Sequence, residues 1–389
     1  MYIRRIIEEQ LANALGNNKV VILLGARQVG KTTLIEPFVR REAGLLLNCD
    51  ISVDKARLLA ASTLTPNEAL RLLGNPPLLV IDEAQTLPDI GRIVKGWYDA
   101  GVAAKIVLLG SSSLDLLDAT AEALTGRNEK LYLTPLLFKE VLSYQAWYSA
   151  NLTREMLAGE FAEQLQTLLL QNMVYGGYPA AVTADDKEKY LLNLTADYLL
   201  RDVLQSGLVK SPQSIKRLLL LLAHQAGSEV SVNELQGALG ISRQTIDHYL
   251  ELLERSYVIF RIGAYSTNQR KEIAKNTKIF FWDTGIRNAL LKEFSFSPLR
   301  SDIGSLFENW AVAEIAKRNM TDGDRNTLYF WRKTGGGEID LIIKGTDTFK
   351  AYEFKWTKQS NTVGSKSFTS SYGIPVEIIT KNRIPEFIT

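Results

Sequence analysis

An eight-residue stretch near the N-terminus, GARQVGKT, has the residue types and the spacing that bind phosphate. It runs from Gly25 to Thr32, fits G-x-x-x-x-G-K-[ST] at every position, and lies between an apolar run and a helix-like stretch. Glycines free backbone amides to face phosphate oxygens, and the lysine reaches the terminal phosphates. The alternative is a glycine turn with a chance lysine. We expect ATP and Mg²⁺ to bind at Gly25, Ala26, Arg27, Gln28, Val29, Gly30, Lys31, Thr32 and Thr33.

Two acids follow a second apolar run, in LLVIDEAQ. Asp82 and Glu83 stand just past four apolar residues, at the end of an expected strand. There Asp82 would hold Mg²⁺ together with Thr32, and Glu83 would polarise the attacking water. One acid at a strand end means little, but two in tandem behind a phosphate loop favour ATP hydrolysis over nucleotide binding alone.

A second set of charged residues lies near the C-terminus, in GGGEIDLIIKGTDTFKAYEFKW. Glu338 and Asp340 occupy alternate positions of one expected strand, and Glu353 and Lys355 occupy alternate positions of the next. Alternate positions point to the same face of a sheet. That face is either a metal site that cuts nucleic acid or the solvated side of an ordinary hairpin, in which acid and lysine form cross-strand pairs.

The elements that must position the phosphate loop are short and apolar. Between residues 19 and 135 the runs VVILLG, GLLLNCD, PPLLVIDE, KIVLLGSSS and KLYLTPL alternate with helix-like stretches. Continuous runs of Val, Ile and Leu are typical of strands buried on both faces of a parallel sheet. We therefore predict an α/β layered domain, followed by a helical connector between residues 136 and 210.

The next stretch, EVSVNELQGALGISRQTIDHYLELLERSYVIFRIG, predicts two helices around a turn at Gly240, the second opened by Ser242, and then a strand. In a helix-turn-helix the start of the second helix enters the DNA major groove. Its candidate DNA contacts are Arg243, Gln244, Thr245 and His248. A basic cluster in the wing and connector adds Arg261, Arg270, Lys271, Lys275 and Lys278. Winged helices also contact proteins, so both kinds of partner stay open here.

Composition limits the class of protein. The chain has 389 residues, 46% of them hydrophobic, with a formal net charge of +2, so any surface for nucleic acid must be a local patch. Its single cysteine, Cys49, excludes an internal disulfide. No apolar run approaches the roughly 18 residues that cross a bilayer. We expect a soluble cytoplasmic protein with no membrane segment.

The motifs IDEAQ, LTGR, TPLLFKEVL, GGYP, DYLLRDVL, FFWDTGIRNALL, GGGEID and EFKW occur here in one order. By this set the chain resembles the prokaryotic AAA+ ATPases that carry a C-terminal DUF4143 region. The resemblance implies a P-loop AAA+ domain (residues 1–140), a helical lid or connector (141–210), a winged helix with its basic connector (211–299) and an α/β domain like restriction endonucleases (300–389). It also implies Ser112 as a sensor of the γ-phosphate. Arg127 is either an arginine finger presented to a neighbouring subunit of a homo-oligomer or a surface arginine.

The resemblance extends to the PD-(D/E)XK nucleases at the C-terminus. Asp340 matches their first acid, Glu353 and Lys355 match their D/E-x-K pair, and Glu308 in LFENW matches a glutamate on an upstream helix. It implies that Glu308, Asp340 and Glu353 bind Mg²⁺ and that Lys355 supports attack on a phosphodiester. Domains of this type often keep the fold and bind a partner without cleaving DNA.

Two functions follow. The first is an ATP-hydrolysing protein that acts on duplex or branched DNA through the winged helix, with a last domain that binds or cleaves DNA. The second is an ATP-switched module for protein interaction whose nuclease-like domain is inactive.

Overall fold

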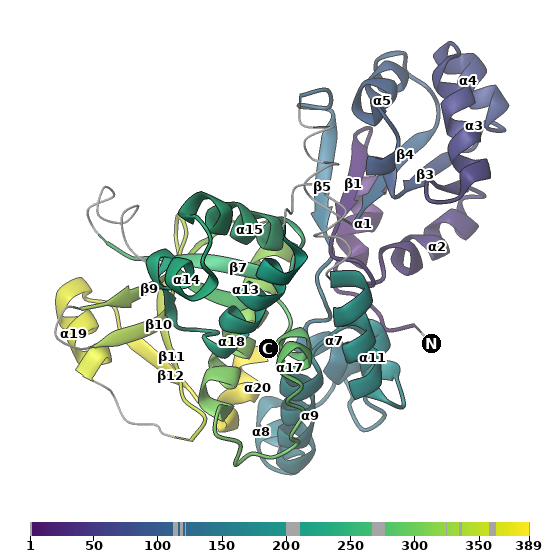
Figure 1. Cartoon of the computed structure of the whole chain (residues 1–389). Coiled ribbons are helices and arrows are strands. Elements are labelled where there is room, and N and C mark those ends of the chain that lie inside the picture. Colours follow the sequence, from purple (N-terminus) through teal and green to yellow (C-terminus); the bar gives the residue numbers. More distant parts are fainter. Residues whose placement is uncertain are drawn as a thin grey trace. The chain divides into compact units, whose positions relative to one another are not determined.

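The computed structural model describes residues 2–111, 116, 120, 122–199, 211–266, 277–323, 325–333, 337–357 and 363–388 (Figure 1). The chain forms two compact units: Met1–Thr134 with Arg255–Tyr257, and Pro135–Glu254 with Val258–Thr389. Four residues with predicted roles, Ser112, Arg270, Lys271 and Lys275, lie outside the described residues. In the described part of the chain, no helix combines the length and the apolar character that crossing a membrane requires.

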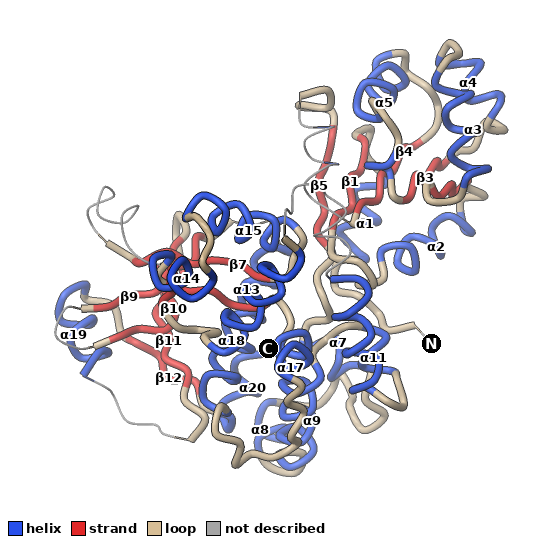
Figure 2. The backbone as a smooth tube through the Cα atoms, viewed as in Figure 1, coloured by secondary structure: helices blue, strands red, loops and turns tan. Residues whose placement is uncertain are grey.

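The first unit contains a five-stranded parallel sheet in the order β2-β3-β4-β1-β5. Figure 2 shows the strands in red. All five predicted strands are present: β1 (Val20–Leu24), β2 (Leu45–Asn48), β3 (Leu78–Asp82), β4 (Lys105–Gly110) and β5 (Asn128–Tyr132). Every residue of β1 and β3 is buried, as their continuous apolar sequences require. The prediction of an α/β domain with a parallel sheet is confirmed.

Helices precede and separate these strands. They are α1 (Glu8–Leu15), α2 (Lys31–Arg41), α3 (Ser52–Ser62), α4 (Pro66–Leu72) and α5 (Ile90–Asp99). The N-terminal apolar stripe begins before the first helix: Ile3, Ile7 and Leu11 are buried, whereas Ile6 is exposed. Apolar residues of β1, β3 and β4 join those of α3, α4 and α5 in one core.

The second unit begins with helices, as predicted for the connector. They are α7 (Phe138–Ser143), α8 (Arg154–Ala158), α9 (Ala162–Tyr175), α10 (Pro179–Thr183), α11 (Lys187–Asn193) and the π-helix η2 (Leu194–Leu199). After the undescribed stretch come α13 (Pro212–His224), α14 (Val232–Leu239) and α15 (Arg243–Arg255). Gly240 ends α14 in a left-handed conformation (φ 67°), and Ser242 Oγ accepts a hydrogen bond from Thr245 N (3.2 Å). The two helices and their turn lie where the sequence predicts them.

A seven-stranded sheet joins the regions that we had assigned to a winged helix and to a nuclease-like domain. Its order is β12-β11-β10-β9-β7-β8-β6, with β7 and β9 parallel. The strand expected as a wing, β7, therefore lies inside the sheet. The strands are β6 (Glu229–Val230), β7 (Ile259–Ala264), β8 (Thr277–Phe281), β9 (Thr327–Arg332), β10 (Glu338–Lys344), β11 (Phe349–Phe354) and β12 (Val376–Ile379).

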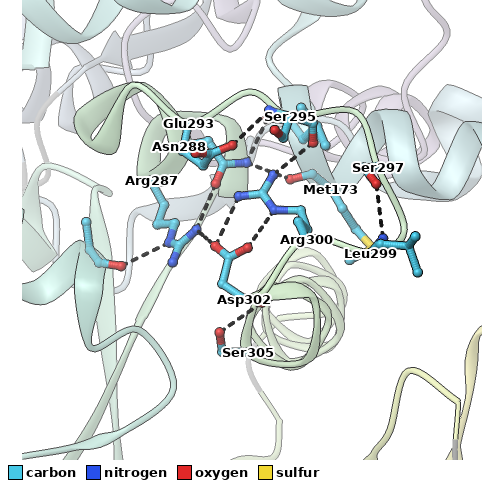
Figure 3. A network of polar contacts seen from close by, with 12 residues as sticks. Met173, Arg287, Asn288, Glu293, Ser295, Ser297, Leu299, Arg300, Asp302 and Ser305 are labelled. Atoms are coloured by element: carbon cyan, nitrogen blue, oxygen red, sulfur yellow. Dashed lines mark hydrogen bonds and ion pairs between the residues drawn. The ribbon is translucent and has the colours of Figure 1, made fainter.

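The remaining helices of the second unit are α17 (Thr284–Leu291), α18 (Ile303–Thr321), α19 (Val363–Tyr372) and α20 (Ile384–Ile388). A polar network ties α17 to the start of α18 (Figure 3). Asp302, next to α18, accepts hydrogen bonds from Arg287 of α17 (2.5 Å) and from Nε of Arg300 (2.6 Å). Asn288 of α17 also donates to the Met173 carbonyl of α9 (3.1 Å). Both arginines are buried, so the Asp302 carboxylate supplies their counter-charge.

Candidate functional site

The phosphate-loop motif joins β1 to α2, where its mechanism requires it. At Gly25 a Cβ atom would come within 2.1 Å of the Leu133 carbonyl oxygen, so this close approach allows only glycine. Gly30 adopts a left-handed conformation (φ 95°) and leads into α2 at Lys31. The two glycines thus shape a loop whose backbone turns tightly between strand and helix.

The side chains at the end of this loop are buried and polar. Lys31 donates from Nζ to the carbonyl oxygens of Gly25 (2.8 Å) and Ala26 (2.9 Å). Thr32 donates from Oγ1 to Oδ2 of Asp82 (2.7 Å), which links the first turn of α2 to the end of β3. Burial and the charge of Glu83 raise the pKa of Asp82, against the lowering effect of the Thr32 hydrogen bond. A hydroxyl and a carboxylate oxygen in this arrangement are ligands of the kind that Mg²⁺ prefers.

The neighbouring acid, Glu83, is held by two residues without a predicted role. Ser111 donates from Oγ to Oε2 of Glu83 (2.9 Å), and Gln85 donates from Nε2 to the same oxygen (2.5 Å). Glu83 itself has a left-handed backbone conformation (φ 50°). Ser111 follows β4 directly and precedes Ser112, which the described residues do not include. The GSSS motif contained the signal, but only the fold shows that Ser111 lies beside Glu83.

The N-terminal segment reaches the same loop through Arg5, to which the sequence assigned no role. Its buried guanidinium donates to the carbonyl oxygens of Val29 (2.9 Å) and Thr134 (2.7 Å). Val29 belongs to the phosphate loop, and Thr134 is the last residue of the N-terminal part of the first unit. An arginine within an amphipathic stretch gives no sequence signal for such a contact.

Arg127 lies away from the phosphate loop. Its side chain forms an ion pair with Asp99 (Nε to Oδ1, 2.6 Å), and its carbonyl accepts a hydrogen bond from Val20 N at the start of β1. The phosphate loop follows the other end of β1. Arg127 is therefore not grouped with Lys31, Thr32, Asp82 and Glu83.

A second group of charged residues surrounds a cavity of about 590 Å³ in the second unit. We call it the carboxylate cavity; its lining consists of Gly227, Ser228, Lys278, Glu308, Arg332, Gly337, Glu338, Asp340, Glu353, Lys355, Val363 and Gly364. All four residues predicted from the nuclease resemblance, Glu308, Asp340, Glu353 and Lys355, line it. Asp340 Oδ2 accepts a hydrogen bond from Phe354 N (2.8 Å) and lies 3.9 Å from Lys355 Nζ. The alternate positions on β10 and β11 do share one face, as predicted.

Three protein families match consecutive parts of the chain. Residues 17–142 match a family described as AAA domain, and residues 303–383 match a domain of unknown function, DUF4143. The chain combines an AAA domain with a DUF4143 domain. Between them, residues 166–297 match another domain of unknown function, DUF8612. The resemblance inferred from the ordered motifs is confirmed.

Relatives match most of the chain in sequence, and a solved structure matches it in fold. The uncharacterized protein Rv2008c of Mycobacterium tuberculosis is 28% identical over 360 residues, which cover 91% of this chain and 74% of that protein. The uncharacterized protein MJ1544 of Methanocaldococcus jannaschii is 27% identical over 355 residues, 88% of this chain and 76% of that protein. A solved Walker-type ATPase of Pyrococcus abyssi superimposes with a TM-score of 0.51 at 18% identity, covering 75% of this chain and 96% of that chain. This likeness shows a P-loop ATPase fold.

The carboxylate cavity, lined by residues of both the DUF8612 and the DUF4143 matches, contains a buried lysine that the sequence assigns to the DNA surface. Lys278 of β8 is 2% exposed, and its Nζ lies 2.9 Å from Glu308 Oε1 and 2.5 Å from Glu338 Oε1. Burial acts to lower the pKa of Lys278, but the charges of Glu308, Asp340 and Glu338 outweigh it and raise that pKa. The prediction of Lys278 as a DNA contact is therefore wrong, because β8 carries its side chain into the cavity.

The predicted metal ligands of the DUF4143 domain do not fit a metal ion. Among the residues described, no group of three or more His, Cys, Asp or Glu side chains is arranged to hold one. Glu308 contacts the Lys278 ammonium, and Asp340 accepts a backbone hydrogen bond. The glycines beside the cavity serve backbone packing, since a Cβ atom at Gly364 would come within 2.4 Å of the Glu338 carbonyl oxygen. The described side chains of Glu308, Asp340 and Glu353 are thus not arranged as the predicted Mg²⁺ site requires.

The predicted DNA contacts on α15 lie at or near the surface. Arg243 and Gln244 are exposed, and Thr245 and His248 are partly buried. Arg243 Nε lies 3.7 Å from Oδ2 of Asp247, one turn further along. Arg261, on β7, forms an ion pair with Glu254. Arg243 and Arg261 are therefore each paired with an acidic side chain of the same unit.

Proposed function

We propose that the AAA domain binds ATP with Mg²⁺ and hydrolyses the ATP. The observation that supports this most directly is the 2.7 Å hydrogen bond between Thr32 and Asp82, because it joins the phosphate loop to the strand end that carries Glu83. Lys31 already points its ammonium group at the loop backbone, within reach of phosphates bound there.

Each residue has a separate part in this proposal. Lys31 binds the terminal phosphates, and Glu83 orients the attacking water through a carboxylate held by Ser111 and Gln85. Thr32 and Asp82 would hold Mg²⁺, which when bound neutralises phosphate charge. Their oxygens are suitable ligands, and the hydrogen bond between them supports the proposal that both serve one ion.

Two substitutions test binding and hydrolysis separately. Lys31→Ala is expected to lose both ATP binding and phosphate release, because the positive charge that binds the phosphates is gone. Glu83→Gln is expected to retain ATP binding while phosphate release falls by about 100-fold, since the amide cannot act as a base. Binding is measured with a fluorescent ATP analogue and hydrolysis by release of inorganic phosphate.

Exposed residues of the same types supply the controls. Lys130→Ala and Glu42→Gln remove surface charges and should leave both measurements unchanged. The proposal fails if Lys31→Ala hydrolyses ATP at the rate of the natural protein, or if Glu83→Gln does.

A second proposal, in which this ATPase acts on DNA, is supported by the exposed Arg243 and Gln244 at the start of α15. Arginine and glutamine can contact both base edges and phosphates. The nearby Asp247 opposes binding to a polyanion. We therefore expect weak affinity for DNA in the natural protein.

The DNA proposal is tested by affinity for duplex and branched DNA at several salt concentrations. Arg243→Ala should weaken binding and flatten its dependence on salt, whereas Asp247→Asn should strengthen binding. If no variant binds DNA, or if affinity does not change with salt, the alternative of an ATP-switched module for protein interaction is favoured instead.

A further inference from the structure

The carboxylate cavity contains its own cation. The Lys278 side chain extends from β8 and is almost fully buried, with its ammonium group between a glutamate of α18 and a glutamate of β10. The ammonium group also faces the Phe330 ring of β9, with Nζ 5.7 Å from the ring centroid. Four elements of the unit, β8, β9, β10 and α18, therefore meet at one positive charge.

The charges around it explain why this lysine stays ionised. Glu308 and Glu338 contact it directly, and the buried Asp340 interacts with it electrostatically. A buried ammonium without such partners would lose its proton. The carboxylates in turn lie against the cation, with Oε1 of Glu308 2.9 Å and Oε1 of Glu338 2.5 Å from Lys278 Nζ. Lysine and acids thus form one ion-paired cluster inside the unit.

A divalent ion would compete for the same oxygens. Mg²⁺ requires near-octahedral coordination at about 2.0–2.1 Å, and it binds carboxylates whose lone pairs are free. Here one oxygen of Glu308 and one of Glu338 accept the Lys278 ammonium, and Asp340 Oδ2 accepts Phe354 N. An additional dication would also be repelled by the fixed positive charge of Lys278.

We propose that the Lys278 ammonium takes the place of a divalent cation in the carboxylate cavity. The cavity consequently binds no Mg²⁺ or Mn²⁺, and its carboxylates do not cleave phosphodiesters by a metal-assisted reaction. Lys278 instead connects α18 to β10 through Glu308 and Glu338. This inference goes beyond the proposed ATPase activity and does not depend on it.

Titration of the nucleotide-free full chain with Mn²⁺, followed by the electron paramagnetic resonance of the free ion, tests the proposal. The natural protein and Asp340→Asn should bind equal amounts of Mn²⁺, because neither has an ion in the cavity. Lys278→Gln keeps the length of the side chain nearly unchanged but removes its charge. It should bind one more Mn²⁺ than the natural protein does, and Lys278→Gln with Asp340→Asn should lose that ion.

Lys355→Gln is the matched control, because it removes a lysine of the same cavity and leaves Lys278 in place. It should behave as the natural protein does. A Mn²⁺ ion that the natural protein binds and Asp340→Asn loses would overturn the proposal. So would a Lys278→Gln variant that is folded by circular dichroism yet gains no ion. If Lys278→Gln does not fold, the comparison of the natural protein with Asp340→Asn still decides, since equal binding supports the proposal and unequal binding overturns it.

Discussion

Arg5 links three parts of the AAA domain through one side chain. Its guanidinium bonds to a phosphate-loop carbonyl at Val29 and to the carbonyl of Thr134, and it is 6% exposed. A buried charged group with two backbone acceptors fixes the conformation of both segments. We infer that Arg5 helps to hold the phosphate loop in the shape that accepts a nucleotide.

Arg5→Ala should therefore weaken ATP binding by about tenfold, which corresponds to about 1.4 kcal/mol. The loss arises because two buried carbonyl groups lose their donor and the loop becomes less ordered. Arg4→Ala is the control, since the neighbouring side chain is 88% exposed and pairs only loosely with Glu8. Titration with a fluorescent ATP analogue makes the comparison. Equal affinities of the two variants would contradict this role.

At the scale of the element, the turn from β1 into α2 depends on its packing against the segment after β5. Leu133 donates from its amide to the Leu24 carbonyl (2.7 Å), and its own carbonyl lies where a side chain on Gly25 would begin. Parallel strands bring these segments together although more than a hundred positions separate them in the sequence. The start of the phosphate loop is thus shaped by β5 as well as by its own glycines.

Gly25→Ala should lower the stability of the AAA domain by roughly 1–3 kcal/mol and abolish ATP binding, because the backbone has to move to admit the methyl group. Gly96→Ala, within α5, places its methyl group in open space and should be neutral or stabilising by up to about 1 kcal/mol. Thermal unfolding and nucleotide titration measure both effects. A Gly25→Ala variant that binds ATP normally would show that the loop tolerates the shift.

At the scale of the whole molecule, the second unit is one continuous structure. Its seven-stranded sheet runs from β12 to β6, and the Asp302 network joins α17 to α18 (Figure 3). Although burial alone would raise the pKa of Asp302, the hydrogen bonds from Arg300 and Arg287 lower it to about 2. A carboxyl whose pKa is lower in the folded state than in the unfolded state stabilises the fold above its unfolded pKa, near 4.

Asp302→Asn should accordingly destabilise the protein by about 2 kcal/mol at pH 7, because two buried arginines lose their counter-charge. The difference from the natural protein should shrink as the pH falls from about 4 toward 2, where Asp302 becomes protonated in the folded state as well. Urea unfolding at pH 7, 5 and 3, followed by tryptophan fluorescence, measures it. Asp89→Asn removes a carboxylate from an exposed pair with Arg92 and should have little effect. A difference that is the same at every pH would exclude the charge of Asp302 as its cause.

The sequence alone determined the strands of the first sheet, the phosphate loop with its tandem acids, and the four charged residues on α18, on β10, on β11 and directly after β11. Continuous apolar runs, local spacing and strand alternation carry that information directly. Only the tertiary structure decided that Ser111 meets Glu83, that Arg5 reaches Val29, and that Lys278 enters a cavity of acids instead of a DNA surface. These outcomes depend on strands paired across long sequence separations, and a side chain's type does not reveal which distant charge will stand beside it.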